Sequence, residues 1–144
     1  MKKVSISLFV LVFSMAAVAQ QKHVSNTEPQ QFILLFRFKS YAPPPTPDQI
    51  KASREKWELW MGGLAQQGKL LGGEQISFSG ITISGFKKAV ANNPVIANNE
   101  MVTGYMLLSA KDLREAEGIA KDCPILAFNG SVELRQIQPQ LKQF

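Results

Sequence analysis

The chain has 144 residues, a length that favours one globular domain. Hydrophobic residues make up 45% of it and charged residues 19%, a balance that argues against an intrinsically disordered protein. The formal net charge of +5 is not gathered into a basic stripe with interleaved aromatic residues, so the sequence argues against a nucleic-acid-binding protein.

The first residues have the composition of a secretory leader. Lys2 and Lys3 are followed by a mostly apolar, uncharged stretch over residues 4–15, and Ala17-Val18-Ala19 supplies the small residues that a signal peptidase needs. We expect cleavage after Ala19, export to the periplasm or the exterior, and no stable membrane span after cleavage. Loss of the two lysines lowers the formal charge from +5 to +3.

Four segments are predicted: a signal peptide over residues 1–19, a flexible segment over 20–31, an α+β domain over 32–139 and a tail over 140–144. The one histidine of the chain, His23, falls in the flexible segment, so the domain has no histidine for catalysis.

Cys123 is the only cysteine, which excludes an intrachain disulfide. We interpret it as a small apolar residue at a helix end before Pro124. A reactive thiol or an intermolecular bridge is the alternative.

Residues 32–39 are the first predicted strand, because phenylalanine and leucine alternate with Ile33, Leu35 and Arg37. A proline triplet at 43–45 predicts a stiff connector.

A helix follows this connector. Thr46 is its expected N-cap, Gln49 completes a capping box, and Gly68 ends it. Its expected apolar stripe is Ile50, Trp57, Met61 and Leu64, with Trp60 beside it.

Residues 69–76 read as a second strand with a bend at Gly72-Gly73, and residues 78–90 as a twisted, exposed hairpin arm. Residues 101–108, apolar at both parities, predict a central strand covered on both faces.

Asp112 is the expected cap of a second helix that ends at Pro124, and the last strand is expected over residues 131–137. The expected inner face of this helix is Leu113, Ala116, Ile119 and Ala120.

The predicted order is β-α-β-(β)-β-α-β, which is the ferredoxin-like α+β plan with an antiparallel sheet and both helices on one face. The other face would expose Ile33, Leu35, Leu107 and Ile137, and such an apolar patch indicates a partner surface. Two sheets packed through this face form a dimeric α/β barrel, so we expect a homodimer.

Charged and aromatic residues of the same face form the candidate site. Glu133 should lie near Arg37, and an interface salt bridge is the favoured interpretation of that pair. The alternative is a ligand carboxylate held by Arg37 and Arg135 above an aromatic floor. The candidate ligand-binding residues are Arg37, Trp57, Trp60, Tyr105, Glu133 and Arg135. No metal site or cofactor is expected, because the domain has one cysteine and no clustered carboxylates.

Several short segments resemble those of a known family: Leu34–Arg37, Leu70–Glu74, Glu100, Gly104-Tyr105, Leu107, Asp122 with Pro124, and Ser131–Arg135. Over residues 31–139 the chain resembles the YCII-related proteins, in particular their DGPF branch. The resemblance implies a dimeric α/β barrel with a cleft on the sheet face. It also implies a largely undefined activity in a fold whose relatives include isomerases and dehalogenating enzymes.

The chain departs from that family at two motifs. The Asp-Gly-Pro-Phe signature stands here as Asn92-Asn93-Pro94-Val95, and Trp57 takes the place of the histidine that the YCII branch pairs with an aspartate. A His/Asp acid–base mechanism therefore does not carry over.

Two functions are compatible with these observations. The absent histidine favours a non-catalytic, exported homodimer that binds a small aromatic or acidic molecule or serves as a structural module. The alternative is a small cofactor-free isomerase- or lyase-like enzyme that uses Tyr105, Glu133 or Asp122 for proton transfer.

Overall fold

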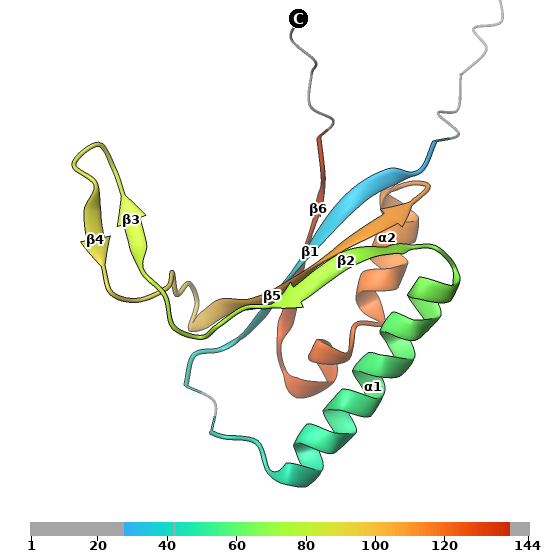
Figure 1. The fold of residues 1–144 in the computed structure, drawn as a ribbon, viewed down its shortest axis with the longest axis horizontal. Coiled ribbons are helices and arrows are strands. Elements are labelled where there is room, and N and C mark those ends of the chain that lie inside the picture. The colour runs from blue at the N-terminus through green and yellow to red at the C-terminus, as the bar shows by residue number, and fades with distance from the viewer. Residues whose placement is uncertain (1–27, 42, 139–144) are drawn as a thin grey trace, which may run out of the picture.

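The computed structural model describes residues 28–41 and 43–138 (Figure 1). The predicted leader with its cleavage site, His23 and the C-terminal tail lie outside these residues. The elements in chain order are β1 (Gln30–Lys39), α1 (Pro47–Gln66), β2 (Leu70–Gln75), β3 (Thr82–Ser84), β4 (Ala89–Ala91), β5 (Glu100–Ala110), α2 (Leu113–Lys121), the 3-10 helix η1 (Pro124–Phe128) and β6 (Ser131–Gln136).

The main sheet has four strands in the order β2-β5-β1-β6, and every neighbouring pair is antiparallel. The helices cover one face of this sheet (Figure 1). The architecture is thus α+β with an antiparallel sheet, as the sequence predicts.

The core lies between the helices and that face of the sheet. Phe32, Leu34, Met106 and Leu108 are the largest fully buried side chains. Register explains why they meet, because Phe32 pairs with Leu108 and Leu34 with Met106 in adjacent strands. The alternating residues of β1 and β5 therefore point to the opposite face, which none of the helices in the described part of the chain covers.

The predicted boundaries of α1 are confirmed. The Thr46 hydroxyl accepts a hydrogen bond from the Gln49 N–H at 3.3 Å, and the Gln49 side chain accepts one from the Thr46 N–H at 2.9 Å. The helix ends at Gln66, and Gly68 follows with a φ of 66°, a left-handed conformation that glycine adopts without strain.

The inner face of α1 is partly as predicted. Trp57, Met61 and Leu64 pack against the core, with Trp60 beside them. Ile50, predicted in the same stripe, is 46% exposed because the first turns of the helix stand over an open groove rather than over the sheet.

The second helix differs from the prediction at two points. Asp112 caps it by accepting from the Glu115 N–H at 2.8 Å, and Ala116 is buried, as expected. Leu113 is 57% exposed, so its assignment to the inner face is wrong: the helix has only nine residues, and its first turn lies outside the core cluster. Pro124 also begins a 3-10 helix, η1, which the sequence analysis missed.

The strands β3 and β4 form a separate two-stranded sheet, which confirms the predicted hairpin arm. In Figure 1 the arm projects away from the helices, from the end of the main sheet where β2 ends and β5 begins. Among the described residues, no helix is both long and apolar enough to cross a bilayer.

Candidate functional site

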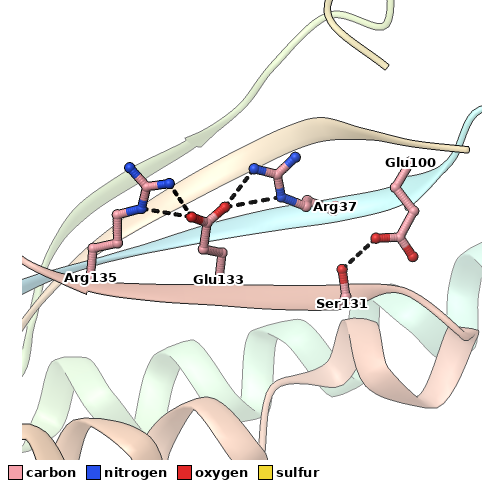
Figure 2. Close-up of polar contacts among 5 residues, drawn as sticks. All are labelled: Arg37, Glu100, Ser131, Glu133 and Arg135. Carbon is pink, nitrogen blue, oxygen red and sulfur yellow. Dashed lines mark hydrogen bonds and ion pairs between the residues drawn. The ribbon is translucent and has the colours of Figure 1, made fainter. Parts of the chain in front are cut away.

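A polar cluster lies on the sheet face that the helices leave uncovered (Figure 2). Glu133 of β6 pairs in register with Leu35 of β1, next to Arg37. Its Oε2 atom accepts hydrogen bonds from Nε of Arg37, at 3.2 Å, and from Nη2 of the same side chain. Its Oε1 atom accepts from the guanidinium of Arg135. The predicted Arg37–Glu133 neighbourhood is confirmed.

These contacts fix the charge of Glu133. Hydrogen bonds from Arg37 and then from Arg135 lower the pKa of the Glu133 carboxyl from its ordinary value of 4.5. A carboxylate with a lowered pKa and both oxygens occupied by arginines is a weak proton acceptor at neutral pH.

A second ion pair continues the cluster along the same face. The Lys39 ammonium donates to Glu100 Oε1 at 2.8 Å, and the Ser131 hydroxyl donates to Glu100 Oε2 at 2.7 Å. The Lys39 bond, then the Ser131 bond, lowers the pKa of Glu100. The bond to Glu100 in turn raises the pKa of Lys39.

The surroundings of the cluster are apolar. Ile33, Leu35 and Leu107 are half-buried on this face of the chain. The sheet face that the helices leave uncovered therefore combines paired charges with half-buried aliphatic side chains.

A groove of about 1110 Å³ lies on the opposite side of the sheet, bordered by α1, η1 and the loop before α1. Seven aromatic residues take part in its lining: Phe36, Phe38, Tyr41, Trp57, Phe78, Tyr105 and Phe128. Two of these rings pack against each other: Phe36 and Trp57 meet edge to face, with their centroids 5.0 Å apart. This groove is the concave, aromatic-lined space of the described chain.

Strand β5 forms the floor of the groove. Four consecutive residues of this strand, 103–106, line the groove. Successive side chains of a strand point to opposite faces, so not all four side chains can face the groove. Main-chain atoms of β5 therefore form part of its floor. Gly104 and Gly73 of β2 lie here, where neither carries a side chain. A Cβ atom at Gly73 would come within 2.6 Å of the Tyr105 carbonyl oxygen, so only glycine fits at this position in the pairing of β2 with β5.

The structure divides the six predicted ligand-binding residues between these two places. Trp57 is among the groove residues. Tyr105 also borders the groove, but it pairs in register with Leu35, as Glu133 does, so its side chain belongs to the uncovered face, as predicted. Trp60 stands behind Trp57, with ring centroids 5.6 Å apart, and does not line the groove. Arg37, Glu133 and Arg135 form the polar cluster on the uncovered face.

Sequence reasoning missed most of the groove. Arg54 of α1 lines the groove. So do Phe38 of β1, Phe78 of the loop after β2 and Phe128 of η1. The detectable signal was the Trp57–Arg54 spacing of three residues, which places both side chains on one side of a helix.

The remaining chemistry-bearing residues lie apart from the groove. Asp122 is the exposed C-cap of α2 and is not a lining residue. Burial raises the pKa of the Cys123 thiol to about 11, which makes a reactive thiolate unfavourable. Within residues 28–41 and 43–138, no group of histidine, cysteine and acidic residues could hold a metal ion.

Comparison with known proteins gives one family. A family model described as the YCII-related domain matches residues 31–140, which is most of the chain. A search of the curated proteins found no match.

Proposed function

This chain belongs to the YCII-related family, and on that premise we propose that it is a ferredoxin-like, homodimeric binding protein for a small aromatic acid. The observation that carries the proposal is the groove between α1 and the sheet. Its volume of about 1110 Å³ is sufficient for a drug-sized molecule, since ligand pockets typically measure roughly 300–1,000 Å³.

The shape of the ligand follows from the lining. Aromatic side chains dominate the groove, and the glycine-bearing floor lets a flat ring approach the sheet closely. A planar aromatic molecule fills such a space with the largest contact area.

The charge of the ligand follows from Arg54. This residue lines the groove, and within the described residues it forms no ion pair. An arginine beside an aromatic groove binds a carboxylate through two parallel N–H donors.

The dimer rests on the uncovered sheet face. Two copies that packed their sheets together would bury the half-exposed aliphatic residues and enclose the Arg37–Glu133 pair. The strand order β2-β5-β1-β6 supports a ferredoxin-like topology, and in a dimeric barrel the groove stays on the outer, helix-covered side of each sheet.

Proton-transfer chemistry is less well supported. Each carboxyl group whose pKa is shifted among the described residues is shifted downward, including Glu133. A general acid–base enzyme needs the opposite, a carboxyl group whose pKa is raised toward neutral pH. We therefore propose binding without catalysis, and we propose export from the composition of the leader.

The test compares an aromatic acid with its neutral isostere. Indole-3-acetate should raise the melting temperature of the chain, and indole-3-acetamide should raise it less. Arg54→Gln should remove the difference between the two probes, whereas Arg114→Gln on α2, a matched control outside the groove, should keep it. Equal responses to both probes in the wild type would contradict a carboxylate site, and the absence of any response to indole, benzoate and cinnamate derivatives would contradict the groove.

A further inference from the structure

The hairpin arm, defined as residues 76–99, carries an apolar surface that nothing in the described chain covers. Eight of the fourteen large hydrophobic residues exposed in the described chain lie in this arm, so exposure is concentrated there rather than scattered. They are Ile76, Phe78, Ile81, Ile83, Phe86, Val90, Val95 and Ile96.

The arm has one apolar face and an apolar tip. Ile83 pairs directly with Val90 across the hairpin, and Ile81 has the same parity as Ile83, so the three share a face. Phe86 lies in the turn and is fully exposed. A free two-stranded hairpin is marginal in water, so a surface that accepts this face would also stabilise the arm.

The charge of the arm has one sign. Between Glu74 and Glu100 the sequence has no acidic residue, and its only charged side chains are Lys87 and Lys88, directly after Phe86 in the turn. The turn is closed by a hydrogen bond from the Lys88 N–H to the Gly85 carbonyl at 3.0 Å. The turn that presents the exposed ring therefore also presents two ammonium groups.

We propose that the arm docks onto an anionic lipid bilayer, with Phe86 inserted at the level of the headgroups and Lys87 and Lys88 bound to lipid phosphates. An exposed aromatic residue beside lysines is the combination that binds membrane interfaces. An anionic surface is the complementary partner, because the only charged side chains of the arm are Lys87 and Lys88. Each lysine near such a surface tightens binding about fivefold. Contact between two arms is disfavoured, since it would bring two lysine pairs together without a carboxylate.

The tip of the arm is separate from the groove, because Phe86, Lys87 and Lys88 are not among the residues that line it. The arm strands pair only with each other, and Figure 1 shows them extending away from α1 and α2. Membrane docking would leave the binding groove on the body of the molecule, and it requires no transmembrane segment.

The experiment places a fluorescent reporter at the tip. The variant Phe86→Trp is mixed with vesicles of phosphatidylcholine, with or without phosphatidylglycerol, and the phosphatidylcholine is brominated in parallel samples. With phosphatidylglycerol present, the introduced indole should be quenched by bromine and its emission should shift to the blue, beyond the response of the wild-type chain with Trp57 and Trp60. Without phosphatidylglycerol, neither effect should occur.

Charge variants distinguish vesicle binding through the arm from binding through the net positive charge of the whole protein. Lys87→Glu/Lys88→Glu should weaken vesicle binding by at least about 20-fold, as expected for two lysines at the surface. Lys51→Glu/Lys111→Glu, the same charge change on the exposed body, should leave it within about twofold.

Three results would overturn the proposal. They are an introduced indole that bromine does not quench, equal loss of binding in both charge pairs, and a sedimentation mass that falls when Phe86→Ser is introduced. The last result would show that a second copy of the chain covers the arm.

Discussion

Arg37 and Glu133 are 96 residues apart in the sequence, yet two nitrogen atoms of the arginine donate to a single oxygen atom of the glutamate. The contact joins the first and last strands of the sheet. It is half-buried, with side chains 25% and 29% exposed, so solvent screens it less than an ion pair that is free on the surface.

Glu133→Gln should destabilise the chain, because it leaves Arg37 and Arg135 close together without their shared anion. We expect thermal unfolding to shift down by a few degrees, and the shift to shrink in high salt. The matched control is Glu117→Gln, which breaks an exposed i,i+4 pair with Lys121 and should have almost no effect. Equal shifts of the melting temperature in the two variants would mean that the Arg37–Glu133 pair stabilises the chain no more than an exposed surface ion pair does.

Stability should fall in acid. The pKa of Glu133, Glu100 and Glu115 is lowered in the folded chain relative to 4.5, so the unfolded chain binds more protons at mildly acidic pH. Their contributions are full above the unfolded value of 4.5 and are lost as the pH drops below it through the lowered folded pKa values. Urea titrations over this range should show a decline that is shallower in Glu133→Gln, and an unchanged slope would contradict the assignment.

Cys123 should be inert in the folded chain. It is 3% exposed, and its pKa rises from 9.0 to about 11 through burial. Two pKa units lower the thiolate fraction roughly 100-fold at pH 8, before steric protection is counted. A thiol reagent such as dithionitrobenzoate should react slowly until urea unfolds the chain, and rapid reaction in buffer would show that η1 opens readily.

Gly73→Ala should be destabilising by about 1–3 kcal/mol, because the new methyl group would overlap the Tyr105 carbonyl and approach the Met106 Cα at 3.0 Å. Backbone atoms of a central strand cannot easily move aside. Gly118→Ala in α2 meets nothing within 4 Å and should stabilise the chain by up to about 1 kcal/mol. Chemical denaturation of the two variants checks both signs.

Leu35→Glu should convert the proposed dimer into a monomer, because it buries a carboxylate at the centre of the sheet face. Leu59→Glu is the control: Leu59 is 79% exposed on α1, and its replacement should leave the mass unchanged. Light scattering after size exclusion gives both masses. A wild-type chain that is already monomeric would remove the dimer from the proposal and leave the groove unaffected.

The elements that local chemistry determines could be predicted from the sequence. The capping box at Thr46 and Gln49 defines the start of α1 through contacts within four residues, and the alternation in β1 assigned Arg37 to the same face as Glu133. Such features depend on near neighbours and on strand parity, both of which are visible in a sequence.

The groove could not be predicted in the same way. Its walls come from β1, α1, β2, β5, η1 and loops, and their approach depends on how α1 lies across the sheet. The exposure of Ile50 and Leu113 has a related cause, since a helical stripe predicts which side faces inward but not where the sheet beneath it ends. The register shift between Phe36 and Arg37 likewise left no mark in the sequence.

The position of β1 inside the sheet has a consequence for biosynthesis. Both strands that flank it are made long afterwards: 61 residues separate Lys39 from Glu100, and 96 separate Arg37 from Glu133. An N-terminal strand whose partners are still on the ribosome cannot complete its hydrogen bonds, and closing such long loops slows folding. We therefore expect the sheet to close only when translation is nearly finished, which would suit the export proposed above.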